Sequence, residues 1–323
     1  MKRHIADDPV ALRHLALLAT GATLISFAPV FVKLVVQRGV EPTPIGFWRL
    51  FLGSMMLFAL SIALGAKPAI SRRRAVYAIL GGLFFAADLF MWHKSIIFIG
   101  AGMATLLANT QVFWTAGLGR ILYGESLSML YLIAVPLAMV GMTMLTGVGS
   151  NIVFDGAYRT GIALGLATGM AYALYLISLK QTSKNRDLTS LDLNLGMSRR
   201  ERITDAIALL AWVSLFSAVF SALMAAVEGV SLAVGWPELG LLAALALVAQ
   251  VAGWILIYVG LGHVSTGRAA LVILLQPTLA MVWGWMFFDE TLIVTQLIGA
   301  AITLSAIYLG GVRRAPTLQQ AAE

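Results

Sequence analysis

The chain has 323 residues, of which 60% are hydrophobic and 11% are charged, and its formal net charge is +7. Soluble domains average roughly 45–50% apolar and about 25% charged residues, so this composition, with a mean hydropathy of +0.89, excludes a soluble globular protein and indicates a membrane protein. The absence of cysteine excludes disulfides, thiolate metal sites and thiol catalysis.

Apolar windows between charged residues and Gly or Pro breaks predict the helices in chain order. Each window is close to the ~20 residues that cross a bilayer. We expect an all-α, polytopic membrane protein with ten transmembrane helices, at residues 14–37, 43–66, 75–99, 101–122, 128–148, 159–181, 204–228, 237–261, 267–288 and 291–312.

The segments outside these windows are short. Residues 1–13 lack a small-residue cleavage site, and the apolar run after them is longer than a signal-peptide core, so we expect them to be retained. The longest polar stretch, 181–202, predicts a loop rather than a second domain. Residues 313–323 are expected to form a tail, and no appended catalytic domain is predicted.

The distribution of basic residues predicts the orientation. Of the 22 Lys and Arg residues, 17 fall in the segments on the same side as the N-terminus, two fall on the other side, and three lie within helices. The positive-inside rule therefore places both termini in the cytoplasm. It also explains the net positive charge, so nucleic-acid binding is not expected, and a bacterial inner membrane is the predicted location.

The sequence contains an internal repeat. A shift of 165 residues aligns Gly102–Ile133 with Gly267–Ile298 without a gap, and nine pairs are identical, among them Gln111 with Gln276 and Glu125 with Glu290. The repeats predicted from this alignment are residues 14–157 and 158–312, with five helices each. Because five is odd, the second copy is expected to have inverted topology, as in many secondary transporters.

Both copies end with a small-residue helix and a Glu just before the last helix, in LLANTQVFWTAGLGRILYGESL and ILLQPTLAMVWGWMFFDETLIVTQLIGA. This pattern resembles the EamA family of the drug/metabolite transporter superfamily. The second copy has the family's helix proline, Pro277, where the first has Val112. The resemblance implies a ten-helix exporter of small metabolites with a central cavity, and it is strongest to amino-acid exporters.

Charged residues within spans are candidate functional residues. Asp88 lies about 16 Å from the outer end of its helix, so it suits proton coupling or binding of a substrate ammonium group, or pairing with Arg49. Arg49 suits either that pairing or substrate contact. Lys33 and Lys94 can make the outer half of the cavity positive, or can extend to the membrane surface as long side chains near helix ends do.

Helical spacing places polar and aromatic residues on shared faces. Gln250, Trp254 and Tyr258 recur every four residues, and Asp88 and Trp92 do so in the equivalent helix of the first repeat. We expect these faces to form the substrate pocket, although Trp and Tyr also fill helix contacts or interfacial belts.

Other residues within the spans are also candidates. The amide of Gln276 can bind substrate or hold neighbouring helices together. Pro29 and Pro277 are candidate hinges or gates, with static kinks as the alternative. Gly161, Gly165 and Gly169 form two GxxxG steps that predict close helix packing.

Together these features predict a secondary transporter that works by alternating access. No Walker A, HExxH or GxSxG motif is present, so neither an enzyme nor a cofactor or metal site is expected. The predicted substrate is a neutral or aromatic amino acid, and a lipophilic cation is the alternative. Proton coupling through Asp88 and facilitated diffusion both remain open, and no obligate protein partner is inferred.

Overall fold

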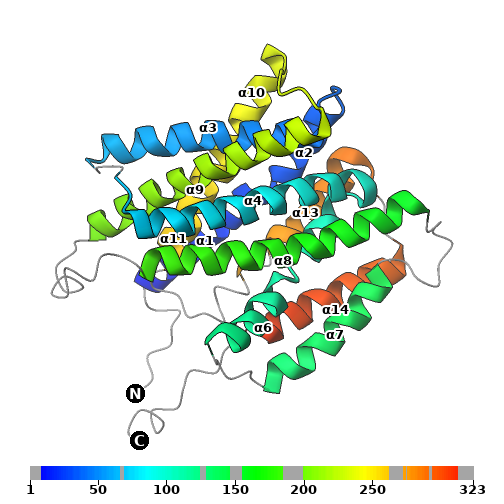
Figure 1. The fold of residues 1–323 in the computed structure, drawn as a ribbon. Helices are drawn as coiled ribbons and strands as arrows, with labels where there is room; N and C mark the ends of the chain where they lie inside the picture. The colour runs from blue at the N-terminus through cyan, green and yellow to red at the C-terminus, as the bar shows by residue number, and fades with distance from the viewer. Residues whose placement is uncertain are drawn as a thin grey trace, which may run out of the picture.

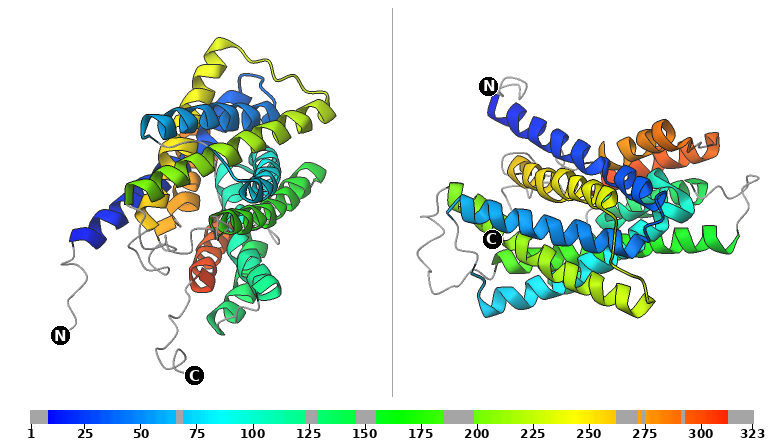
Figure 2. Two further views of the ribbon diagram at one scale, coloured as in Figure 1. Left: turned by 60° about the vertical axis from the view of Figure 1, so that its left-hand side comes forward. Right: turned by 90° about the horizontal axis from the view of Figure 1, so that it is seen from above.

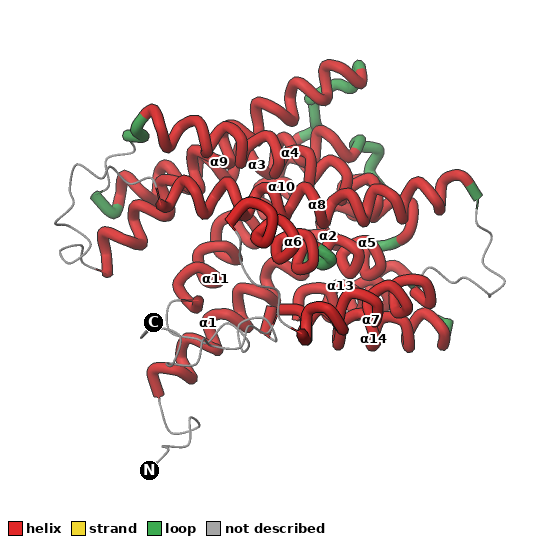
Figure 3. The backbone as a smooth tube through the Cα atoms, turned by 60° about the horizontal axis from the view of Figure 1, so that its bottom comes forward, coloured by secondary structure: helices red, strands yellow, loops and turns green. Residues whose placement is uncertain are grey.

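A computed structural model describes residues 9–65, 69–123, 129–145, 155–184, 199–261, 272–273, 275–290 and 293–311. Every regular element in these ranges is a helix, which confirms the all-α expectation for the described residues (Figure 3). Six helices are long and apolar enough to cross a membrane, and the two helices Met129–Leu145 and Val294–Leu309 are apolar but shorter.

The elements correspond in order to the ten segments expected from the sequence. In Figure 1 the long helices lie side by side, with α3 at one edge of the bundle and α7 and α14 at the other. The elements are α1 (Pro9–Ser26), α2 (Ala28–Val36), α3 (Pro42–Ala63), α4 (Arg72–Ile99), α5 (Ala101–Ala108), α6 (Gln111–Tyr123), α7 (Met129–Leu145), α8 (Gly156–Lys184), α9 (Arg199–Glu228), α10 (Trp236–Leu245), the π-helix η3 (Ala246–Gly253), α11 (Trp254–Leu261), α13 (Leu275–Phe288) and α14 (Val294–Gly311).

Three of the expected segments are not single α-helices. The first is divided at Phe27 into α1 and α2, and the fourth is divided at Asn109 and Thr110 into α5 and α6. The eighth contains the eight-residue π-helix η3 between α10 and α11. Such departures from the α-helix are common at functional sites and where backbone lines a cavity.

Local chemistry explains the first of these breaks. Pro29 lacks an N–H group, so it cannot donate to the carbonyl four residues earlier. The amide of Val30 donates to the carbonyl of Phe27 at 3.0 Å, and the hydroxyl of Ser26 donates to the carbonyl of Thr23 at 2.6 Å. The chain is therefore divided into two helices at Phe27, where these two hydrogen bonds satisfy the carbonyls of Phe27 and Thr23.

Several helix contacts recur when the two predicted repeats, residues 14–157 and 158–312, are exchanged in chain order. α4 packs on α8, and its counterpart, η3 with α11, packs on α1 (Figure 2). α4 also packs on α9, as η3 and α10 pack on α3. The pairs α3–α9, α5–α13 and α7–α14 each join a helix to its own counterpart.

Glycines permit the closest of these approaches. A Cβ atom at Gly161 would lie 2.6 Å from side-chain atoms of Phe98 and Ile99 at the end of α4, and one at Gly165 would lie 3.0 Å from Leu107. Real Cβ atoms essentially never come closer than 3.0 Å to such atoms. The predicted packing role of the α8 glycines is therefore confirmed.

Candidate functional site

A central cavity lies between the two halves of the bundle. Its free volume of about 90 Å³ is enough for several water molecules. The lining combines ionisable, amide and aromatic side chains and comes from both halves: Ile25, Ser26, Pro29, Arg49, Phe85, Asp88, Leu89, Trp92, Thr105, Ala108, Asn109, Gln111, Thr168, Tyr172, Trp254, Ile273 and Gln276.

The cavity brings together most of the site residues expected from the sequence. Five of the expected binding residues line it: Arg49, Asp88, Trp92, Trp254 and Gln276. They come from segments that lie far apart in the chain, and the candidate hinge Pro29 lines the cavity with them. Because Pro29 lies beside the break at Phe27, the freed backbone there also faces this cavity.

The two opposite charges of the cavity are not directly paired. Arg49 is 3% exposed and Asp88 is 7% exposed, yet no ion pair within 4.0 Å joins them in the described part of the chain. The guanidinium carbon of Arg49 lies 5.9 Å from the centre of the Trp92 ring, and its Nη1 atom has no hydrogen-bond partner among the described residues. Buried polar groups are nearly always hydrogen-bonded, so this site has unused capacity to bind an anion.

Aromatic rings form one wall. The Phe85 and Tyr175 rings stack with centres 4.5 Å apart, and Tyr172 and Tyr175 stack at 5.9 Å. The Trp254 ring meets Tyr172 edge to face at 6.3 Å. Its Nε1–H group is buried and has no partner among the described residues, so this wall offers an apolar face with a hydrogen-bond donor.

Two expected site residues among the described side chains, Gln250 and Pro277, do not line the cavity. Gln250 is 2% exposed and lies behind Arg49, whose Nε donates to the Gln250 Oε1 atom at 3.3 Å. Pro277 is buried in the first turn of α13. Tyr258 belongs to α11, but its side chain lies outside the described residues, as does Glu125.

Sequence reasoning gave no role to Thr168 and Phe85, which also line the cavity. The Thr168 hydroxyl is buried without a partner among the described residues. Thr168 lies in an apolar stretch that no charge distinguishes, and only the packing of α4 on α8 places it on the cavity. Phe85 lies one turn before Asp88 on α4, so helical spacing from Asp88 could have found it.

Lys33 and Lys94, by contrast, are neutralised. Lys33 forms an ion pair with Glu290, whose carboxylate also accepts the amide N–H of Ala101 at 3.1 Å. Lys94 forms an ion pair with Glu228. Neither lysine lines the central cavity. Of the three basic residues expected within spans, only Arg49 does.

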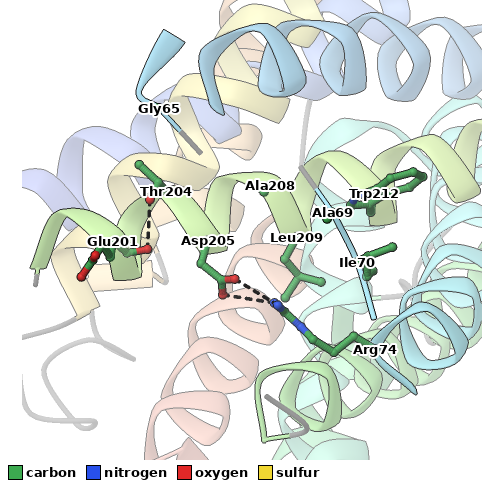
Figure 4. Close-up of a pocket in the computed structure, with 10 residues that line it drawn as sticks. All are labelled: Gly65, Ala69, Ile70, Arg74, Glu201, Thr204, Asp205, Ala208, Leu209 and Trp212. Carbon is green, nitrogen blue, oxygen red and sulfur yellow. Dashed lines mark hydrogen bonds and ion pairs between the residues drawn. The ribbon is translucent and has the colours of Figure 1, made fainter. Parts of the chain in front are cut away.

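A second pocket lies where α4 and α9 begin (Figure 4). Arg74 donates to both carboxylate oxygens of Asp205, at 3.0 and 3.1 Å, and the Thr204 hydroxyl donates to the carbonyl of Glu201 at 3.0 Å. Bidentate pairs of this kind fix the relative position of two elements. This pocket shares no lining residue with the central cavity, so we assign it a structural role.

The described residues include no group of three or more His, Asp or Glu side chains placed to hold a metal ion. The groups that line the central cavity suit reversible binding, through one cation, one anion, amides and aromatic faces.

The chain is similar to known proteins over most of its length. An uncharacterised transporter from Archaeoglobus fulgidus is 25% identical over 297 residues, which cover 91% of this chain and 94% of that protein. A probable amino-acid metabolite efflux pump from Salmonella typhimurium is 24% identical over 268 residues, covering 79% and 84%. One solved crystal structure has the same fold, with a TM-score of 0.63 at 15% identity, over 92% of this chain and 98% of that one.

The sequence matches one family twice, at residues 12–147 and again at 159–311, and the two matches together span most of the chain. Members of that family are transporters rather than enzymes. The apolar helices of membrane length agree with a multi-pass membrane protein. This chain therefore belongs to the EamA-like transporter family.

Proposed function

We propose that this transporter exports zwitterionic amino acids, neutral or aromatic, across a bacterial inner membrane by alternating access. In this proposal Arg49 binds the substrate carboxylate, Asp88 binds the ammonium group, and the apolar part of the substrate lies against Trp92, Tyr172 and Trp254.

The observation that carries the proposal is the separation of charge in the cavity. Arg49 and Asp88 line the same space without a direct ion pair between them, and Arg49 retains an unpaired N–H group. Leaving charges buried and unpaired is costly, so a ligand that supplies both a carboxylate and an ammonium group gains from both. A lipophilic cation would satisfy Asp88 but would be repelled by Arg49.

The proposal includes ten membrane spans in two inverted repeats of about 14–157 and 158–312, with both termini in the cytoplasm. The recurrence of several contacts between the halves supports it, because the contacts of α4 with α8 and α9 have counterparts in those of η3 with α1 and α3 when the halves are swapped. The printed name of the Salmonella relative, a probable amino-acid metabolite efflux pump, supports the substrate class.

The test is uptake into proteoliposomes of amino acids, their carboxamide analogues and quaternary amines. We expect saturable uptake of amino acids and little uptake of analogues that lack the carboxylate. Arg49→Gln should abolish amino-acid uptake. The matched control is Arg38→Gln, because Arg38 pairs with Glu238 at 3.6 Å and its side chain is half exposed, so its loss should change little.

Two outcomes would contradict the proposal. Uptake of quaternary amines without amino acids would favour the lipophilic-cation alternative. Normal amino-acid uptake by Arg49→Gln would remove the carboxylate site that the proposal places at this residue.

A further inference from the structure

A chain of buried side chains leads from Arg49 away from the cavity. The Nε atom of Arg49 donates to Oε1 of Gln250 at 3.3 Å, and Nε2 of Gln250 donates to the hydroxyl of Ser214 on α9 at 3.1 Å. Gln250 and Ser214 are 2% and 1% exposed. Neither lines the cavity, so neither reaches a ligand there directly.

The chemistry of the groups fixes the direction of this chain. A guanidinium has only donors, so the amide oxygen of Gln250 must face Arg49 and the amide nitrogen must face an acceptor. Ser214 supplies that acceptor. With its Nε edge held in this way, the guanidinium of Arg49 keeps its Nη1 atom free.

The backbone makes room for this arrangement at two places. Gly53 lies one turn after Arg49 on α3, and a Cβ atom there would lie 2.6 Å from Cγ of Gln250. Gln250 itself belongs to the π-helix η3, whose wider turn shifts side chains relative to an α-helix. The glycine and the π-helix together allow the Gln250 side chain to pass directly over α3.

We propose that Gln250 and Ser214 are positioning residues that hold the Arg49 guanidinium in the orientation that binds the substrate carboxylate. This inference rests on the proposed function, because it takes Arg49 as the carboxylate site. It departs from the sequence expectation that Gln250 contacts substrate: here Gln250 acts on Arg49, and Ser214 acts through Gln250.

The first test measures transport kinetics. Gln250→Leu removes the hydrogen bond to a charged group and should raise KM for amino acids about tenfold or more, with a smaller change in kcat. Ser214→Ala should raise KM about threefold, and Ser214→Thr, which keeps the hydroxyl, should restore it. The control is Ser217→Ala on the same helix, because the Ser217 hydroxyl only donates to the carbonyl of Val213 at 2.8 Å.

The double variant separates a relay from independent effects. If Ser214 acts only through Gln250, Gln250→Leu with Ser214→Ala should have the same KM as Gln250→Leu alone. Additive increases in KM, or an effect of Ser217→Ala as large as that of Ser214→Ala, would overturn the relay and indicate general damage to α9.

A second measurement does not depend on the substrate. In protein labelled with ¹⁵N-arginine, the Arg49 Nε–H signal is assigned by its absence in Arg49→Lys. Gln250→Leu should accelerate exchange of this proton with solvent, and Ser214→Ala should do so to a smaller extent. An unchanged exchange rate in Gln250→Leu would overturn the positioning role.

Failure of this inference is distinguishable from failure of the proposed function. If Arg49→Gln loses amino-acid uptake while Gln250→Leu keeps the wild-type KM, the relay is wrong and the carboxylate site stands. If Arg49→Gln transports normally, the carboxylate site and its relay are both wrong. If the protein transports no amino acid, the proposed function is wrong and the exchange measurement alone decides whether Gln250 holds Arg49.

Discussion

At the scale of single residues, the charges within the helices differ in whether the protein satisfies them. Lys33 and Lys94 each have a glutamate partner, whereas Arg49 and Asp88 share a cavity without pairing to each other. A buried charge without an opposite charge beside it is unfavourable for folding alone. Its presence beside aromatic faces therefore supports the proposed binding of a ligand in this cavity.

Trp254 provides a test of the aromatic wall. Trp254→Ala removes an apolar face and an unpaired donor from the cavity and should lower kcat/KM for transport about tenfold or more, while the protein still purifies as a folded monodisperse species. Trp236→Ala is the control, because Trp236 is 85% exposed. Retained transport with a collapse of thermal stability would instead make Trp254 a packing residue.

Asp88 is the residue to test for energy coupling. Asp88→Asn keeps the shape of the side chain and removes its ability to exchange a proton. Because Asp88→Asn also loses the negative charge proposed to bind the ammonium group, its residual flux is measured at saturating substrate. If export is proton-linked through Asp88, a pH gradient should accelerate substrate flux into proteoliposomes for the wild type and leave the residual flux of Asp88→Asn unchanged.

Two results of that experiment would go against the hypothesis. Equal wild-type transport with and without the gradient would exclude proton coupling and favour facilitated diffusion. An identical response of the wild type and Asp88→Asn would show that coupling exists but that another group carries it.

At the scale of elements, sequence periodicity predicted the order of the helical segments but not their interruptions. An apolar window shows only how long and how hydrophobic a segment is. A continuous α-helix, a broken helix and a helix with a π-helical turn can have the same length and hydrophobicity. Pro29 did indicate an irregularity beside Phe27, since its missing N–H group has a local effect. Nothing in the stretch around Gln250 indicated η3, which packs against α1 and α3 in the structure.

The same reasoning explains which site residues could be predicted. Asp88 and Arg49 are charged residues within apolar spans, so their charge singled them out, whereas Trp254 was found by its four-residue spacing from Gln250. The position of Gln250 behind Arg49 could not be predicted, because helical spacing assumed an α-helix where the chain forms a π-helix. Ser214 had no distinguishing signal, since a serine in a membrane helix commonly bonds to its own backbone.

Packing of α8 on α4 gives a prediction for the element scale. Gly161→Ala would place a Cβ atom 2.6 Å from Phe98 and Ile99, so we expect destabilisation of about 1–3 kcal/mol and a lower Tm in a thermal-shift assay. Gly240→Ala in α10 is the control, because nothing lies within 4 Å of a Cβ atom there, and its Tm should stay equal or rise. Equal Tm values for the wild type and both variants would contradict the packing role.

At the scale of the whole molecule, the arrangement of helices is consistent with a two-fold relation between the halves. Swapping the halves maps the contact of α4 with α8 onto the contact of η3 and α11 with α1, and leaves α3–α9 and α7–α14 unchanged. Five crossings per half would make that relation an inversion across the membrane. A cavity lined by both halves would then open to either side when one half moves against the other.

The proposed orientation follows from the excess of Lys and Arg on one side and can be tested directly, because the chain contains no cysteine. Single cysteines replace Asn151, between α7 and α8, and Asn194, between α8 and α9, and are exposed to a membrane-impermeant maleimide on intact cells. Asn151→Cys should react and Asn194→Cys should not, since the positive-inside rule places only the second in the cytoplasm.

After permeabilisation both should react, which controls for accessibility. Labelling of Asn194→Cys alone on intact cells would reverse the orientation, and the proposed direction of export would then have to be reversed with it.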